Sequence, residues 1–289
     1  MAAGATNRGR YNIADMYFRG ATRPTNYYMA LVTNAVTCGV DTNTLSELTQ
    51  ISDGGYSDGG QTVTFDNLTE GSSLANIQVA NQAWTPTTSI APVQAILTDD
   101  NVTVGSRDIF FFWDVTGTSI PPGPYTVIDA QIDFAFNSGQ WTERGMYEVL
   151  NYCFNSGTAP TNLYMALIRA TSVPVTTTNV LSDLTQINTG TGYSDGGYTL
   201  NLDATDFDTL TENDTNDRAE LQTKDLVFTA SGDDLDGSGG AGARYSVMTD
   251  HDATVANRSV LWWGDLVSNR NPVDGNTLTL VDNESRITI

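Results

Sequence analysis

The sequence predicts a mainly β protein built from two tandem β-sandwich modules, or two small barrels, each beginning with a short α-helix. Three observations support this prediction. Charged residues make up only 16% of the 289 residues, whereas Thr, Asn, Asp, Gly and Ser are abundant, a composition that favours strands and polar turns. Short apolar runs alternate with turns rich in Gly, Asp and Asn. Finally, much of the first half of the chain returns in the second half.

The internal repeat is clearest where residues 18–31 return as residues 154–167, with nine of fourteen positions identical. The spacing between matching residues begins at 136, becomes 137 and then 151. The second copy therefore carries an insertion, which we expect within 203–217 or 231–242 because both stretches are acidic or Gly-rich. We expect one domain over residues 1–137 and a second over residues 138–289. The other matching segments are 45–51 with 181–187 and 56–60 with 193–197.

Each copy is predicted to open with a helix. Tyr147, Leu150 and Phe154 fall at i, i+3 and i+7, which places them on one helix face, and the first copy repeats the pattern upstream of Phe18. Thr6 and Thr142 are suitable N-caps. Gly20 and Gly157 lie where the chain must leave each helix.

Strands are expected after each helix. The first pair covers residues 28–32 and 164–168, directly after a turn containing Pro, Thr and Asn. Residues 62–65, 198–202 and 131–136 alternate between apolar and polar, the period of a half-buried strand. The continuous apolar runs 109–113 and 260–263 occupy equivalent places in the two copies, and we expect them to be central strands covered on both faces.

Charge and composition argue against several classes of function. The formal net charge is −21 and Lys224 is the only lysine, so we expect no binding to nucleic acid or to an anionic membrane surface. The N-terminal residues do not resemble a signal peptide, and no apolar stretch has the length of a transmembrane helix. Cys38 and Cys153 fall at different points of the two copies, so we expect two reduced, buried thiols.

We expect no enzymatic activity, and the predicted sets of catalytic, cofactor-binding and metal-binding residues are empty. His251 is the only histidine, and Asp100 stands at its equivalent in the first copy. We interpret His251 as a surface turn residue because no second histidine completes a metal site or triad. The recurring pairs Asp99 with Asp250 and Asp114 with Asp265 are interpreted as turn-forming or strand-capping residues.

Three further motifs have a structural and a functional interpretation. Residues 233–237 resemble a calcium loop but lack its regular ligands and distal Glu, which leaves calcium binding open. Residues 56–60 have glycines without a lysine, so we expect a tight turn and not a phosphate-binding loop. The aromatic run at 110–113 with Trp262 and Trp263 is interpreted as core, while Trp84 and Trp141 are expected near loops as better candidates for exposed contacts with a glycan.

The arrangement of these elements resembles a known group of proteins. A short helix, a strand of the Tyr-Met-Ala-Leu type, a stretch ending in Gly-Tyr-Ser-Asp-Gly-Gly and a late hydrophobic strand are similar to small virion proteins of tailed bacteriophages. The resemblance covers most of each repeat and supplies no catalytic residue. It implies a capsid decoration (cement) protein, or a tail or fibre-attachment component. The duplication and the acidic insertion depart from the single-module pattern.

The resemblance and the composition together predict a virion structural protein made in the host cytoplasm, most simply a decoration protein on the outer head surface. Its expected partners are the major capsid protein or other virion proteins, and we expect a homo-oligomer that needs no cofactor. Two alternatives stay open. One is a tail, collar or fibre-attachment protein of the virion, and the other is a pair of carbohydrate-binding modules.

Overall fold

The computed structural model describes residues 3–33, 35–52, 55–71, 74–115, 117, 119–128, 130–134, 140–281 and 284–287. Within this part of the chain the protein is mainly β, as the sequence predicted. The two α-helices, α1 and α2, stand at the predicted places near the start of each repeat. Their bounds are α1 (Asn7–Phe18) and α2 (Glu143–Phe154).

Each repeat contains one principal antiparallel sheet, and the two sheets have equivalent strand orders. The first repeat has the order β1-β8-β7-β2-β3, and the second has β17-β16-β11-β12. The strands of the first sheet are β1 (Ala3–Ala5), β2 (Tyr27–Val32), β3 (Gln61–Val63), β7 (Gln94–Thr98) and β8 (Ile109–Asp114). Those of the second are β11 (Asn162–Arg169), β12 (Tyr198–Asn201), β16 (Ala243–Thr249) and β17 (Val260–Arg270).

Each repeat also contributes a three-stranded sheet and a two-stranded ribbon. The three-stranded sheets have the orders β10-β5-β4 and β13-β14-β19, and the ribbons are β6-β9 and β15-β18. In the first repeat these strands are β4 (Phe65–Gly71), β5 (Leu74–Val79), β6 (Gln82–Trp84), β9 (Tyr125–Val127) and β10 (Ala130–Phe134). In the second they are β13 (Thr209–Asn213), β14 (Arg218–Gln222), β15 (Leu226–Thr229), β18 (Thr277–Leu280) and β19 (Glu284–Ile287).

Both helices begin at the predicted threonine caps. The Oγ1 of Thr6 accepts the backbone N–H of Gly9 at 2.9 Å, and the Oγ1 of Thr142 accepts that of Gly145 at 2.8 Å. Each hydroxyl also donates to a carbonyl of the repeat's own late strand, Thr6 to Ile109 and Thr142 to Val260. One side chain therefore starts the helix and ties it to the sheet.

The two helices end at equivalent positions with the same backbone geometry. Gly20 has a φ of +70°, so the first helix is followed by a left-handed glycine as predicted. In the second repeat the left-handed residue is Ser156, with a φ of +61°, and Gly157 is not left-handed. Gly157 donates its N–H to the carbonyl of Asn151 at 2.9 Å, as Ala21 does to that of Asp15 at 3.1 Å, which satisfies one of the last carbonyls of each helix.

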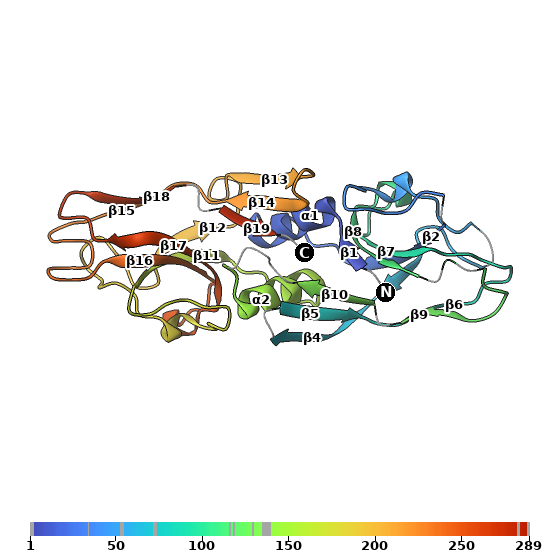
Figure 1. Ribbon diagram of the computed structural model, residues 1–289, viewed down its shortest axis with the longest axis horizontal. Helices are drawn as coiled ribbons and strands as arrows, with labels where there is room; N and C mark the ends of the chain where they lie inside the picture. The colour runs from blue at the N-terminus through green and yellow to red at the C-terminus, as the bar shows by residue number, and fades with distance from the viewer. Residues whose placement is uncertain are drawn as a thin grey trace.

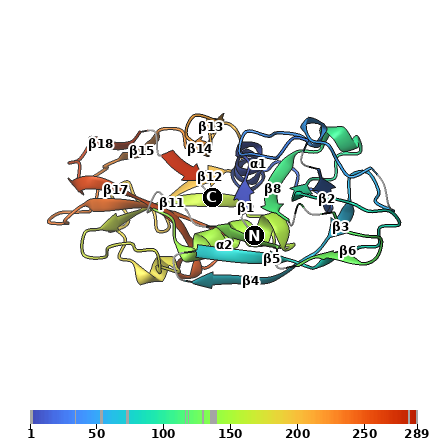
Figure 2. The same ribbon diagram turned by 45° about the vertical axis from the view of Figure 1, so that its right-hand side comes forward.

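The helices pack crosswise between the two repeats. Helix α1 of the first repeat lies against β13 and β14 of the second, and α2 of the second lies against β4 and β5 of the first. The two helices also contact each other, side by side in the middle of the elongated molecule (Figures 1 and 2). Each three-stranded sheet is thus covered by the helix of the other repeat.

The crosswise packing has the same chemistry on both sides. The ring of Phe18 in α1 lies 5.6 Å from that of Phe207 in the second repeat, and the ring of Phe154 in α2 lies 5.3 Å from that of Phe65 in the first. All four rings belong to or pack against a single hydrophobic core that draws residues from both repeats. Full burial of a phenylalanine contributes roughly 1.5–3 kcal/mol. Phe18, Phe154 and Phe207 are buried and Phe65 is partly buried, so this junction is a major part of the core.

Ion pairs repeat the crosswise relationship at the surface of the junction. Arg8 at the start of α1 lies 3.3 Å from Glu212 in β13, and Arg144 at the start of α2 lies 3.6 Å from Glu70 in β4. Both pairs are partly exposed, and each contributes only about 0–1 kcal/mol. The two pairs are equivalent, since in each the arginine at the start of a helix reaches the three-stranded sheet of the other repeat.

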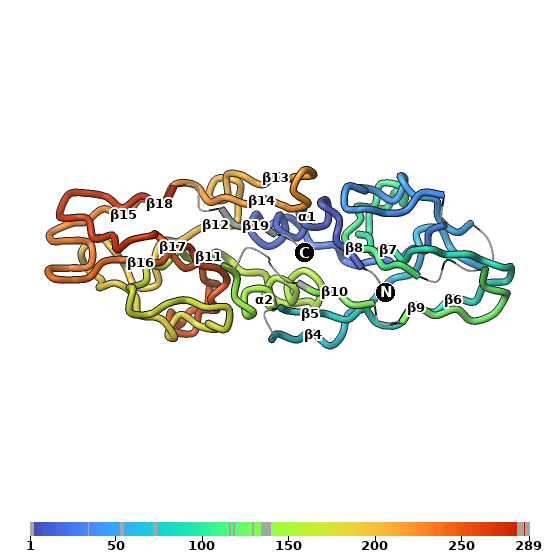
Figure 3. Tube along the Cα trace, in the orientation of Figure 1, coloured from blue at the N-terminus to red at the C-terminus, as the bar shows by residue number. Residues whose placement is uncertain are grey.

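The two principal sheets lie at opposite ends of the molecule, and the helices lie between them (Figure 3). The first and last strands, β1 and β19, lie nearer the middle than the ends (Figure 3). Strand β1 runs along β8 of its own repeat, and β19 pairs with β14.

Most predicted strands are present, with one interruption and one change of position. The strand expected over 62–65 is split, because β3 ends at Val63 and β4 begins at Phe65. The run at 109–113 is an inner strand as predicted, whereas β17 is the last strand of its sheet. In the second repeat the connections between β12 and β13 and between β15 and β16 are longer than their equivalents in the first repeat. These connections contain parts of both stretches in which the insertion was expected. The predicted domain boundary at 137/138 lies outside the described residues.

Gly9 and Gly145 allow each helix to touch the late strand of its own repeat. A Cβ added at Gly9 would lie 2.5 Å from the carbonyl oxygen of Phe110, and one added at Gly145 would lie 2.3 Å from that of Leu261. These neighbours are backbone atoms, so they cannot move aside as a flexible side chain could. Any side chain at either position must push the helix away from the sheet.

We therefore expect Gly9→Ala and Gly145→Ala each to lower the free energy of unfolding by about 1–3 kcal/mol, the usual cost of overpacking. Urea denaturation followed by circular dichroism measures this. Gly39→Ala is the matched control, because a Cβ there would meet no atom within 4 Å, and we expect a change within about 0.5 kcal/mol. Equal stability of the helix variants and the control would contradict the close approach.

Candidate functional site

An arginine stacked on a tyrosine recurs at the same place in both repeats. The guanidinium of Arg107 lies 3.9 Å from the ring centre of Tyr28, and that of Arg258 lies 3.4 Å from the ring centre of Tyr164. Arg107 also donates to the carbonyls of Gly59 and Asn101, and Arg258 donates to those of Gly196 and Asp252. Each arginine is thus committed to joining two loops to the sheet.

The Tyr-Ser-Asp-Gly-Gly elements form tight turns, as predicted. Gly60 and Gly197 have positive φ values of +76° and +86°. The hydroxyl of Tyr56 donates to the side chain of Gln50 and accepts the N–H of Leu31, and Tyr193 makes the equivalent bonds with Gln186 and Leu167. The conspicuous repeated motif therefore holds a loop against the sheet.

The recurring Asp99 and Asp250 also accept hydrogen bonds from backbone N–H groups. Asp99 accepts the N–H groups of Asn101 and Asp108, each at 3.2 Å, and Asp250 accepts those of Asp252 at 3.2 Å and Ser259 at 3.0 Å. Burial raises the pKa of Asp99 to about 6, although these hydrogen bonds act in the opposite direction. This is the turn-forming role that the sequence predicted for this pair.

The second recurring pair differs between the repeats. Asp114 accepts a hydrogen bond from Gln94 at 3.1 Å. Asp265 accepts one from the guanidinium of Arg244 at 2.9 Å and another from the N–H of Val267 at 2.7 Å. Asp265 therefore lies next to a cation that balances its charge.

The acidic loop at 233–237 holds a buried carboxylate that is already fully engaged. Arg169 binds the two oxygens of Asp236 at 2.6 and 3.0 Å, and the N–H groups of Asn188 and Gly242 donate to the same carboxylate. Burial alone would raise the pKa of Asp236, but the bonds from Arg169 and the backbone outweigh it and hold the pKa below its ordinary value. This geometry uses the loop's central carboxylate as an anchor between loops.

The described residues contain no group of three or more His, Cys, Asp or Glu side chains placed to hold a metal ion. Both cysteines are free and buried, as expected. Burial raises the pKa of the Cys38 thiol to about 12 and raises that of Cys153 still further. A thiol with such a raised pKa is a poor nucleophile, because little of it is ionised at neutral pH.

His251 is half-buried and does not project freely from a surface turn. It lines a cavity of about 30 Å³ together with Tyr17, Glu148 and Asp250, a space for roughly one water molecule. Burial raises the pKa of Glu148, although Arg144 at 2.7 Å acts against that effect. The cavity is too small for an organic substrate.

The aromatic residues are distributed differently from the prediction. Trp84 and Trp141 are only 4% and 2% exposed, so the expectation that they make exposed contacts is wrong. Trp141 packs against Phe18 with ring centres 5.9 Å apart, because the start of the second repeat is drawn into the crosswise core. Phe110, Phe111, Trp113 and Trp262 are buried core residues, as interpreted from the sequence, whereas Phe112 and Trp263 are only partly buried.

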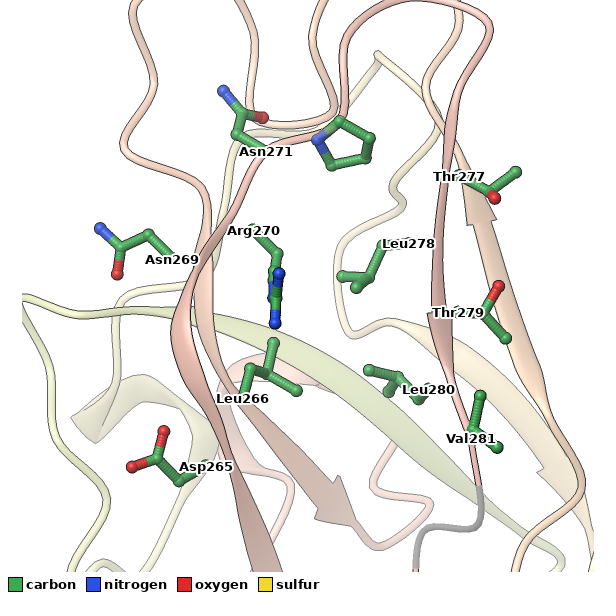
Figure 4. A pocket seen from close by; sticks show the side chains of 11 residues that line it. Asp265, Leu266, Asn269, Arg270, Asn271, Thr277, Leu278, Thr279, Leu280 and Val281 are labelled. Carbon is green, nitrogen blue, oxygen red and sulfur yellow. The ribbon is translucent and has the colours of Figure 1, made fainter.

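A groove is present at the outer end of the second repeat. It lies between β17 and β18 and has a volume of about 650 Å³, within the range of ligand pockets (about 300–1,000 Å³). Figure 4 shows Leu266, Arg270, Leu278 and Leu280 pointing into the space between the two strands. The remaining lining residues are Asp265, Asn269, Asn271, Pro272, Thr277, Thr279 and Val281.

The groove was not predicted from the sequence. Apart from the recurring Asp265, its residues come from the far end of β17, the connection after it and β18 with the residue that follows, and none of them belongs to a repeated motif. One signal was present: the stretch 277–280 alternates between threonine and leucine, the pattern of a strand with one apolar face. What that face would meet depends on the tertiary structure.

No protein-family model, no curated protein and no solved structure matches this chain. Among the residues that the structure describes, neither helix is long and apolar enough to cross a membrane.

Asp236→Asn tests the anchoring role of the acidic loop. We expect a loss of about 1.5–3 kcal/mol in the free energy of unfolding at pH 7, because the buried Asp236 carboxylate would no longer accept charge-assisted hydrogen bonds from Arg169, whose side chain is 24% exposed. The folded-state pKa lies below the ordinary 3.8, so the charged form stabilises the fold above that value and its contribution falls as the pH drops below it. The difference in free energy of unfolding between the wild type and the Asp236→Asn variant should therefore become smaller from pH 5 to pH 3.

The measurement is urea denaturation at pH 7, 5 and 3. Asp225→Asn is the control, since Asp225 is exposed and its side chain makes no hydrogen bond or ion pair with the residues that the structure describes. An Asp236→Asn variant as stable as the control at pH 7 would refute the anchoring role.

Proposed function

We propose that this chain is a structural protein of a bacteriophage virion, most simply a decoration protein on the outer surface of the head. The observation that carries the proposal is the crosswise packing of α1 and α2, which joins two equivalent sheets into one elongated body (Figure 1). A body with similar ends suits a protein that bridges neighbouring, equivalent subunits of a shell. The resemblance of each repeat to small phage virion proteins supports the same function.

The finer architecture is part of this proposal. Each end of the molecule is proposed to be a β-sandwich or small barrel formed by a principal sheet and the ribbon beside it. The three-stranded sheet of each repeat then serves as the joint, since it receives the helix of the other repeat. In this arrangement the outer ends are available for contacts while the middle supplies rigidity.

The proposed role is non-enzymatic. The repeated polar motifs of the described residues hold loops together: the arginines stack on tyrosines, and Asp99 and Asp250 bind backbone N–H groups. The charge of −21 suits an outward surface and not one that faces packaged DNA. The proposed partners are the major capsid protein or other virion proteins, with assembly as a homo-oligomer on the particle.

Within the virion, a tail, collar or fibre-attachment position is the main alternative, and the same bridging body would serve it. The carbohydrate-binding alternative has less support, because the two tryptophans proposed to contact a glycan are buried.

Cryo-electron microscopy of the purified source particle tests the proposal. We expect density for this chain on the outside of the head, spanning the junction between neighbouring capsomers, with the two ends on equivalent subunits. Density at the tail or portal would instead support the alternative, a tail, collar or fibre-attachment protein. Absence of the chain from purified particles, checked by mass spectrometry of the same sample, would refute the virion function.

A further inference from the structure

We propose that the groove between β17 and β18 binds an extended segment of a partner polypeptide that carries apolar side chains and one carboxylate. The first part of the argument is the backbone. Among the described residues β17 is paired only with β16 along its outer half, and β18 only with β15. Strands paired on one side can take up an additional strand through main-chain hydrogen bonds.

The fold already places extended segments along this edge. In the first repeat β1 runs antiparallel to β8, with Ala5 opposite Phe111. In the second repeat Trp141 bridges to Trp262 at the equivalent place, and Trp263 donates its N–H to the carbonyl of Gln140 at 2.9 Å. Beyond Asp265, β17 continues to Arg270, whereas β8 ends at Asp114. The added length of β17 forms one wall of the groove.

The side chains of the groove define the chemistry of the occupant. Leu278 and Leu280 form an apolar floor that is only 9% and 4% exposed, and the half-buried Leu266 adds accessible apolar surface that a side chain of an extended segment would cover (Figure 4). The lining residue Val281, whose side chain is 59% exposed, adds further accessible apolar surface. Exposed apolar residues gathered around a groove mark an interaction site more often than isolated ones do.

Arg270 supplies the charge selectivity. Its guanidinium points into the groove and makes no ion pair, hydrogen bond or ring contact with any residue that the structure describes. Asp265, the acidic residue of the lining, is balanced by Arg244 at 2.9 Å. In a chain with a net charge of −21, the groove therefore presents one uncompensated positive charge. A carboxylate on the bound segment complements it.

The test uses the full-length protein and two fluorescein-labelled, end-capped octapeptides of alternating leucine and threonine. One carries a central glutamate and the other a central glutamine. By fluorescence polarisation we expect the glutamate peptide to bind about three- to tenfold more tightly, the range for a partly exposed charge-assisted contact. Arg270→Gln should abolish this difference while leaving binding of the glutamine peptide unchanged.

Arg218→Gln is the matched control, because Arg218 lies in β14 and pairs with Glu220, outside the groove lining. This variant should keep the preference for glutamate. Failure of both peptides to bind the wild-type protein would overturn the proposal, as would a preference that survives Arg270→Gln.

The assignment of the natural segment to another virion protein rests on the proposed function. The binding chemistry of the groove does not depend on that function. The two can fail separately. Peptide binding by a chain that is absent from particles would refute the virion function alone. A chain found on the head that shows no charge-selective binding would refute the groove proposal alone.

Discussion

The packing of each helix onto the three-stranded sheet of the other repeat is the contact on which the rest of the structure depends. A three-stranded sheet with one apolar face is unstable in water unless that face is covered. Phe18 and Phe154 provide the cover from opposite repeats, against Phe207 and Phe65. Neither repeat can bury its sheet with its own helix in this arrangement, so the two halves stabilise each other.

This dependence gives each of the repeated motifs a distinct structural role. The caps Thr6 and Thr142, with Gly9 and Gly145, fix each helix to the late strand of its own repeat. Once a helix is fixed to that strand, its opposite face can cover the three-stranded sheet of the other repeat. The stacked Arg107 and Arg258 then hold the loops at the two ends. The outcome is a stiff middle with an equivalent sheet at each end.

The sequence was sufficient for local structure because local structure depends on neighbouring residues. The threonine caps, the helix faces, the Tyr-Ser-Asp-Gly-Gly turns and the duplicated strands are all visible as patterns of a few residues. The crosswise packing was not predicted, because two equivalent repeats offer equivalent apolar faces, and nothing in the pattern states whether a helix covers its own sheet or the other. Trp141 illustrates the consequence: it stands beside a predicted loop, yet the crossing buries it against Phe18.

The groove lies in a part of the second repeat that differs from the first repeat. The two repeats keep equivalent strand orders in their principal sheets, whereas β17 and the connections between β12 and β13 and between β15 and β16 are longer in the second copy. Differences of this kind lie at the surface, where they alter neither core, and they give the two ends of the molecule different chemistry. Two equivalent sheets can therefore carry two different sets of contacts.

Equilibrium unfolding of the Phe18→Ala variant, followed by ¹⁹F NMR of protein labelled with 5-fluorotryptophan, tests the crosswise packing most directly. Trp113 reports on the first repeat and Trp263 on the second, and Val102→Ala, at a side chain that is 97% exposed, is the control. Removing the ring should cost about 3–5 kcal/mol. If the repeats complete one core, both signals will shift together to the same lower urea midpoint. A shift of the Trp113 signal alone, with Trp263 unfolding at its wild-type midpoint, would show two independent modules and contradict the account.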